Sequence, residues 1–407
     1  MTAAVPFPSE TEVDLESPSA AEVEIITRAL ATGASGPGGL TVTQRAVLNA
    51  LSASMTGVLF DVAGVEPLGP DELAHALRFR NREFRTRIIQ VMLLAELLLV
   101  PLPPEVSAQV EAYAERLGVG DDIIQVAREI SHGSLGLALI DFERSGYFQH
   151  LLDDPPDHLH VSAALSHAWD TACFDEALYQ RWVALAECPD GSLGQGVYRF
   201  YRARGFTYPG RAESAPPLLA QHDFVHVVAE YGSTVECEIE VFGLISRAND
   251  DPAAFSLLAM VLGLFETGYL HTAAQGFFEP DRGHLSADAD RMAARLADAI
   301  YRGAAMATHL DVEGREHETD LLARDWFADA ERPLSEIRAD LGLPPRSEVA
   351  VAQGSVTPWE RGGISPFQFA AGQRAAAESG EPYESYGASP GSDRDPAAGF
   401  ERATERA

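Results

Sequence analysis

Apolar residues recur at helical spacing along most of this 407-residue chain. The segments 41–60, 71–79 and 105–119 place them three or four residues apart, which puts them on one face of an α-helix. Pro70 suits the first turn of a helix, and Gly118 suits the residue just after a helix end. The pattern therefore predicts an all-α fold.

Breaks in this pattern divide the chain into four parts. Residues 1–40 are predicted to be a flexible segment with one short helix, since the stretch 33–39 is glycine-rich. Residues 41–150 are predicted to form a helical module, and residues 160–345 a second helical domain after an acidic, proline-rich connector. Residues 346–407 are rich in Gly, Ser, Pro and Ala without periodicity, which predicts a disordered tail.

The charged residues exclude several functions. All 30 basic residues are arginine, and the formal net charge is -31. Without lysine the chain has no P-loop lysine, no strand lysine of a protein kinase and no amine for Schiff-base chemistry. Nucleic-acid binding relies on clustered cations, so no nucleic-acid partner is expected.

Cysteine usage and hydropathy indicate the cellular compartment of the protein. Cys173, Cys188 and Cys237 are widely spaced and form neither a disulfide framework nor a Cys-x-x-Cys site, which is typical of the reducing cytoplasm. The N-terminus lacks the features of a signal peptide. The apolar run 88–103 contains Glu96 and is shorter than the roughly 20 residues that span a bilayer, so it predicts a buried helix.

The segment that carries chemistry is His222-Asp223-Phe224-Val225-His226, followed by Glu238. His222 and His226 are four residues apart on a predicted helix, which places both imidazoles on one face. A helix stop at Tyr231–Thr234 turns the next helix back and brings Glu238 towards them. Two histidines with one or two carboxylates suit a divalent cation with open coordination positions. Asp223 either coordinates from the flank or orients an imidazole.

This motif, His-Asp-x-x-His, eleven residues and Glu, resembles the signature of the coenzyme Q (ubiquinone) biosynthesis protein 4 family. Gly191–Phe206, the apolar run 257–268, Asp325-Trp326 and Pro333–Gly342 resemble the family's other landmarks in order and spacing. The resemblance covers roughly residues 160–345. In the N-terminal module, the helix order and the run 85–98 resemble TerB-like helical domains.

The resemblance implies that His222, Asp223, His226 and Glu238 hold a divalent metal ion. Zn²⁺ is the expected ion, with Fe, Mn or Mg as alternatives, and no further catalytic or cofactor-binding residue is assigned. It also implies an apolar cavity for an isoprenoid or prenylated quinone precursor, and a metal-dependent decarboxylase or lyase activity in quinone biosynthesis. The reaction would be oxidative decarboxylation and hydroxylation of a prenylated hydroxybenzoate.

Two other functions remain open from the sequence. One is a non-catalytic scaffold that binds isoprenoid lipid and organises the proteins of a biosynthetic complex. The other is a stress-linked interaction protein, in which the N-terminal module dominates. The expected location is the cytoplasm, with peripheral contact at the inner membrane face as a further option.

Four other segments are interpreted from the sequence. The apolar helices Phe255–Phe265 and Val241–Ile245 are predicted to bury the prenyl tail, although most of their residues are expected to be core. His158 and His160 lie beside Asp153, Asp154 and Asp157 in an acidic connector, where a metal site is one interpretation and a solvated loop is the preferred one. The polar stretch His309–Glu318 is interpreted as exposed surface.

Overall fold

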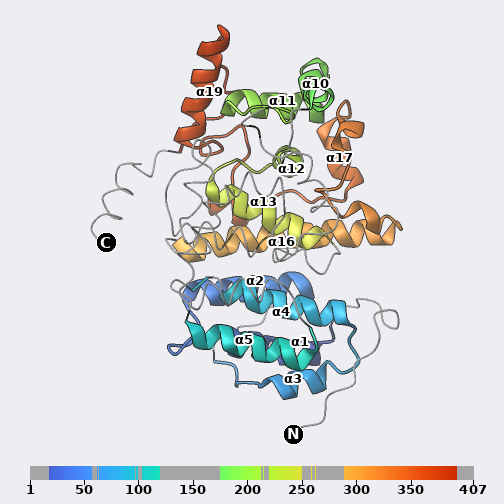
Figure 1. Ribbon diagram of the computed structural model, residues 1–407, viewed down its shortest axis with the longest axis vertical. Helices are drawn as coiled ribbons and strands as arrows, with labels where there is room; N and C mark the ends of the chain where they lie inside the picture. Colours follow the sequence, from blue (N-terminus) through green and yellow to red (C-terminus); the bar gives the residue numbers. More distant parts are fainter. Residues whose placement is uncertain are drawn as a thin grey trace, which may run out of the picture.

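The computed structural model of the chain describes three regions, and every element in them is a helix (Figure 1). They are residues 18–119 without 57–61, 63, 97 and 100–102; residues 175–249 without 212–213 and 215–219; and residues 288–391. Leu258 and Leu262 are described as well. The prediction of an all-α fold is confirmed.

In the described part of the N-terminal module, five helices lie together at one end of the molecule (Figure 1). They are α1 (Ala20–Ala34), α2 (Val42–Thr56), α3 (Pro70–Ala76), α4 (Arg82–Glu96) and α5 (Pro104–Leu117). Pro70 is the first residue of α3, and Gly118 ends α5 in the left-handed conformation with φ 64°. Both helix boundaries therefore follow the signals in the sequence.

Helix α1 belongs to the core of this module. Ser19 and Glu22 form a capping box at its start, and Val23, Ile26 and Leu30 are buried along one face. The short helix predicted within residues 1–40 is therefore confirmed, and it packs into the module instead of lying in a flexible segment. The short helix within that segment is stable because its apolar face packs against α2, α4 and α5. Residues 1–17 lie outside the described residues.

The long helix α16 (Ala289–Val312) joins the two halves of the molecule. It packs against α2 of the N-terminal module and against α13 (Val235–Ala248), which carries Glu238 (Figure 1). Two glycines allow α13 and α16 to approach closely: a Cβ at Gly303 would lie 2.4 Å from the Leu244 carbonyl oxygen, and a Cβ at Gly243 2.7 Å from Leu296 Cδ1. The N-terminal module thus packs, through α2, against α16, the helix that supports α13 and Glu238.

The remaining elements surround the helix that carries both histidines, α12 (Gln221–Ala229). Helix α11 (Leu193–Arg204) packs against α12, and so does α17 (Leu334–Asp340). Four short elements also lie in the described part of this half: α10 (Glu176–Val183), η2 (Ala184–Glu187), η4 (Glu316–Glu318) and η5 (Trp326–Asp329).

The predicted disordered tail is wrong for residues 346–391. This segment contains α18 (Glu348–Ala352) and α19 (Pro366–Ser379), and α19 packs against α11 (Figure 1). Ile364 and Gln368 are completely buried. The segment lacks long apolar periodicity because hydrogen bonds to neighbouring loops, rather than a broad apolar face, hold much of it in place. Residues 392–407 lie outside the described residues.

Three predicted features also lie outside the described residues. They are the helical stretch 120–148, the loop of His158 and His160, and all of Phe255–Phe265 except the buried Leu258 and Leu262. Among the helices that are described, none combines the length and hydropathy needed to cross a membrane.

Candidate metal centre

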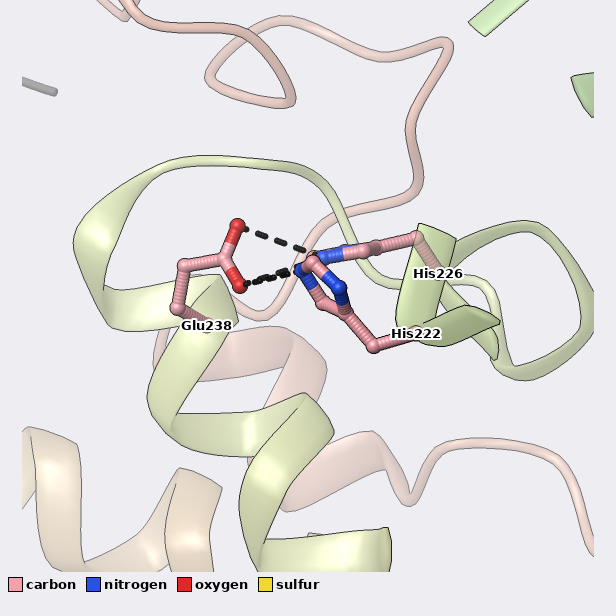
Figure 2. A group of neighbouring side chains, drawn as sticks. All are labelled: His222, His226 and Glu238. Carbon is pink, nitrogen blue, oxygen red and sulfur yellow. Dashed lines mark hydrogen bonds and ion pairs between the residues drawn. The ribbon is translucent and has the colours of Figure 1, made fainter. Parts of the chain in front are cut away.

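Two neighbouring helices bring three ligand-type side chains together, as the sequence predicts. His222 and His226 project from α12, and Glu238 projects from the first turns of α13 with its carboxylate facing their ring nitrogens (Figure 2). One ligand atom from each of the three residues lies within 4.8 Å of the other two. Among the described residues this is the one such group of metal-ligating side chains.

The distances within the group match a mononuclear metal site. Glu238 Oε2 lies 3.3 Å from His222 Nε2, and Glu238 Oε1 lies 3.2 Å from His226 Nε2. Ligand atoms that bind one cation at about 2.0–2.2 Å are separated from each other by roughly 3–4 Å. Glu238 therefore lies at the spacing of a co-ligand from each of the two histidines.

Glu238 is held as a carboxylate by the two imidazoles. Burial of its side chain works to raise the pKa, but the charge of His226 and the hydrogen bonds from both histidines outweigh this effect. They lower the pKa of Glu238 to about 2. A metal ligand must be deprotonated, so this environment presents Glu238 in the form that binds a cation.

The orientation of His226 is set by its second ring nitrogen. Nδ1 lies 2.6 Å from the Gly232 carbonyl oxygen and 3.3 Å from that of Tyr231. A carbonyl oxygen only accepts hydrogen bonds, so Nδ1 carries a proton. Nε2 faces Glu238 and is the ring nitrogen that would bind a metal ion once it gives up its own proton. The Phe200 ring stacks on the imidazole at 5.3 Å between centroids. Both contacts fix the ring plane.

Asp223, the fourth predicted ligand, lies at the edge of the group. Its Oδ1 is 3.7 Å from His222 Nε2, while its Oδ2 accepts a 2.5 Å hydrogen bond from the Tyr201 hydroxyl. Burial raises the pKa of Asp223, and the charges of His222 and His226 offset only part of that rise. Asp223 follows His222 directly and lies about 100° round the helix, so it reaches the site from the flank. Its role as a ligand stays a prediction.

Two arginines cap the carbonyl end of α12 and hold the histidine helix in place. Arg338 on α17 donates to Val228 O at 2.7 Å and Val227 O at 3.1 Å. Arg302 on α16 donates to Ala229 O at 2.9 Å. These carbonyls have no partners within the helix, and the negative end of the helix dipole favours cations. The sequence placed Arg338 in a landmark block without assigning it a role.

The helix end itself adopts an uncommon conformation. Glu230 follows α12 with φ 62°, in the left-handed region that glycine usually occupies. Its carboxylate lies 3.2 Å from the Arg338 guanidinium. The ion pair and the capping hydrogen bonds offset the free-energy cost of the left-handed backbone at Glu230. This backbone conformation turns the chain sharply towards α13.

An aromatic cluster supports Tyr201, which the sequence reasoning did not single out. The Tyr201 ring lies 4.8 Å from that of Trp182 and stacks on Tyr208 at 5.3 Å between centroids. Trp182 also contacts Phe224, which precedes Val225 on α12. This packing fixes the Tyr201 hydroxyl against Asp223. A tyrosine on a buried helix face has no sequence signature that separates this role from ordinary core packing.

The other predicted segments give different outcomes. His309 and Glu313 are partly exposed and lie 3.5 Å apart, and Glu318 pairs with Arg315 and Arg324, so the interpretation of this stretch as surface is confirmed. In Val241–Ile245, three of the four side chains are completely buried, and α13 packs against α16. The expectation that most of this segment is core is also met.

Comparisons of the chain with protein families, with curated proteins and with solved structures find no match. The chemistry of the site therefore rests on its own geometry. Two imidazole nitrogens and a carboxylate form a donor set that suits Zn²⁺, Fe²⁺ or Mn²⁺ and leaves further coordination positions to other ligands.

Proposed function

We propose that this chain binds one divalent cation through His222, His226 and Glu238, with Asp223 as a flanking carboxylate. The observation that carries the proposal is the convergence of three buried ligand-type side chains within 4.8 Å. Isolated buried carboxylates are costly, and Glu238 is stabilised here by groups that also bind metals. Zn²⁺ is the first candidate, and Fe, Mn or Mg are the alternatives.

We propose an isoprenoid quinone precursor, a prenylated hydroxybenzoate, as the substrate class. The resemblance of residues 160–345 to the coenzyme Q biosynthesis protein 4 family supports it. In the proposed reaction the bond between ring carbon one and its carboxyl group breaks, and CO₂ leaves. One oxygen atom of O₂ forms the new hydroxyl group at that carbon, and the other becomes water with two electrons and two protons from an external reductant.

A bound divalent cation would supply Lewis-acid stabilisation of developing negative charge on an oxygen atom. The residues of the chain would supply the positioning. His226 is fixed by its hydrogen bond to the Gly232 carbonyl, and His222 stacks on Phe242 at 5.4 Å. Tyr201 holds one oxygen of Asp223 and leaves the other beside His222. The rings of Phe200 and Phe242 keep water away from the two imidazoles.

A second candidate function is a scaffold that binds isoprenoid lipid and uses the metal ion structurally. The burial of the site favours it: His226 is completely inaccessible, and His222 and Glu238 are 9% and 4% exposed. Closed metal sites are typical of structural roles, whereas catalytic sites keep an open position for substrate.

A turnover assay separates the two functions. The full chain, loaded in turn with Zn²⁺, Fe²⁺ or Mn²⁺, is incubated with prenylated 4-hydroxybenzoate, O₂ and a two-electron reductant, and CO₂ and the hydroxylated ring are measured. The enzyme proposal expects product from the native chain and none from a folded His226→Ala variant. Product formation that survives the loss of the metal would contradict it. Lipid that co-purifies with an inactive, metal-loaded chain would support the scaffold instead.

A further inference from the structure

The loop between the two ligand helices is short, and residues from a distant segment of the chain form hydrogen bonds with it. Only Glu230–Thr234 separates α12 from α13, and within this loop the Gly232 carbonyl accepts the hydrogen bond of His226 Nδ1. A rotation of the Gly232–Ser233 peptide would therefore remove the group that fixes this imidazole. The partners of this peptide determine how well His226 is positioned.

Those partners come from a segment more than a hundred residues later, Ser355–Gln368, which we call the clasp. The Gly232 amide donates to Val356 O at 2.9 Å, and the Ser233 amide donates to Gly363 O at 3.0 Å. The backbones lie so close that a Cβ at Gly232 would be 2.7 Å from Gly363 Cα. The clasp thus holds both sides of the peptide whose carbonyl orients His226.

The Gln368 side chain completes this contact. Its Nε2 donates to Ser233 O at 2.9 Å, and its Oε1 accepts from Ser233 Oγ at 2.7 Å. Gln368 is completely buried, and Ser365 caps the helix on which it lies. Because its amide pairs with both the backbone and the side chain of Ser233, it fixes that residue from two directions.

Arg204 links the clasp to Phe200, the ring that stacks on the His226 imidazole. Its guanidinium is completely buried and donates to Ser233 Oγ, to Gly363 O at 2.8 Å and to Pro358 O at 3.2 Å. The same group lies over the Phe200 ring at 3.8 Å, and Phe200 stacks on His226. One buried side chain therefore contacts both Phe200, which stacks on the His226 ring, and Ser233, which follows the Gly232 carbonyl.

We propose that the clasp, together with Arg204, is a positioning element of the metal centre and raises its affinity for a divalent cation. This inference rests on the proposed metal site. Partners of a ligand imidazole typically change metal affinity about 10–100-fold when they are removed. The clasp acts one step further away, through the Gly232 carbonyl, so we expect an effect near the lower end of that range.

Binding linkage gives the proposal a second consequence. If the docked clasp raises the affinity for the metal, then the metal must stabilise the docked clasp by the same factor. Addition of metal to the full chain should therefore slow amide hydrogen exchange in residues 356–368. Metal binding to the folded chain also slows exchange that occurs through global unfolding, so a segment that only completes the fold would gain no more protection than the N-terminal module.

The test compares two buried glutamines in the full-length chain. Gln368→Leu removes the contacts to Ser233, whereas Gln44→Leu removes equivalent ones in the N-terminal module, where Gln44 Nε2 donates to Ala34 O and Ala95 O. Co²⁺ binding is followed by its visible absorption, and Zn²⁺ by competition. We expect Gln368→Leu to weaken both affinities about 10-fold and to alter the Co²⁺ spectrum, and Gln44→Leu to change them less than about twofold.

The outcomes separate the inference from the function on which it rests. Equal affinities in the native chain and in Gln368→Leu would overturn the role of the clasp and leave the metal site intact. Ser233→Ala, which removes only a hydroxyl, takes the place of Gln368→Leu if that variant does not fold. Failure of the native chain to bind either ion would overturn the metal site and the inference together. Metal-dependent exchange protection of residues 356–368 that disappears in Glu238→Gln would support both.

Discussion

The Tyr201 hydroxyl donates a 2.5 Å hydrogen bond to the buried carboxylate of Asp223, across the interface between α11 and α12. This contact connects the aromatic cluster of the core to the edge of the candidate metal centre. It also leaves Asp223 with one oxygen committed and one facing His222 at 3.7 Å. The orientation of a potential fourth ligand is therefore set by a tyrosine outside the ligand motif.

Tyr201→Phe should destabilise the protein and weaken metal binding. The variant leaves a buried carboxylate oxygen without its donor, which costs about 1–3 kcal/mol of the free energy of unfolding. Urea unfolding of the metal-free chain measures this loss, and Co²⁺ titration measures the affinity. Tyr208→Phe, in the ring stacked on Tyr201, is the matched control and should change both quantities less. Equal effects of the two substitutions would contradict the role of the Tyr201 hydroxyl.

Gly303→Ala should disrupt the contact between α13 and α16. The new methyl group would lie 2.4 Å from the Leu244 carbonyl oxygen and 3.0 Å from the Ala248 nitrogen, both backbone atoms. The helices must separate, and overpacking of this kind costs about 1–3 kcal/mol, which exceeds the ~1 kcal/mol that alanine gains in a helix.

Thermal unfolding compares Gly303→Ala with Gly38→Ala. A Cβ added at Gly38 would have no atom within 4 Å apart from its chain neighbours. The control should leave the midpoint nearly unchanged. A Gly303→Ala chain as stable as the native one would show that α13 and α16 do not pack as described.

Arg338→Ala should loosen the carbonyl end of the histidine helix. It removes hydrogen bonds to Val227 O and Val228 O and the ion pair with Glu230, at an expected cost of about 1–3 kcal/mol. Chemical denaturation measures the change against Arg374→Ala, an exposed arginine on α19 whose loss should cost less than about 0.5 kcal/mol. A negligible difference between the two variants would contradict the capping role of Arg338.

Glu96→Gln should remove a pH dependence that originates in the N-terminal module. Burial raises the pKa of Glu96 to about 8, and the nearby Ser107 side chain lowers it only in part. The unfolded chain loses this proton near the ordinary value of 4.5. The contribution of Glu96 to stability is therefore fully present below pH 4.5 and is lost as the pH rises through about 8, by at most ~1.4 kcal/mol per pH unit.

The measurement for this prediction is the free energy of unfolding of both chains at pH 5 and pH 8. The stability of Glu96→Gln relative to the native chain should increase between the two values, because the amide has no proton to lose. A difference that stays constant with pH would show that Glu96 is not protonated in the folded state.

The sequence predicts the ligand helices well because their signals are local. Helical spacing places His222 and His226 on one face, and the stop before Val235 returns the chain so that Glu238 meets them. Pro70 and Gly118 mark helix ends for similarly local reasons. All of this is visible within a window of about 20 residues.

The features that the sequence reasoning missed depend on contacts between distant segments. The clasp lacks apolar periodicity because it contacts Ser233 through hydrogen bonds. Backbone groups and the buried side-chain amide of Gln368 make these bonds. Arg204 looks like a surface arginine by type, yet its partners are carbonyl oxygens and a hydroxyl in the interior. Polar contacts of this kind leave no pattern in a single sequence.

Elemental analysis of the purified full-length chain, combined with Co²⁺ titration, tests the central claim most directly. We expect one divalent cation per native chain, an absorption spectrum that reflects histidine and carboxylate ligands, and loss of the bound ion in both His226→Ala and Glu238→Gln. Thermal unfolding confirms that each variant is folded. A native chain that retains no cation, or variants that bind it as tightly as the native chain, would contradict the assignment of His222, His226 and Glu238 as a metal centre.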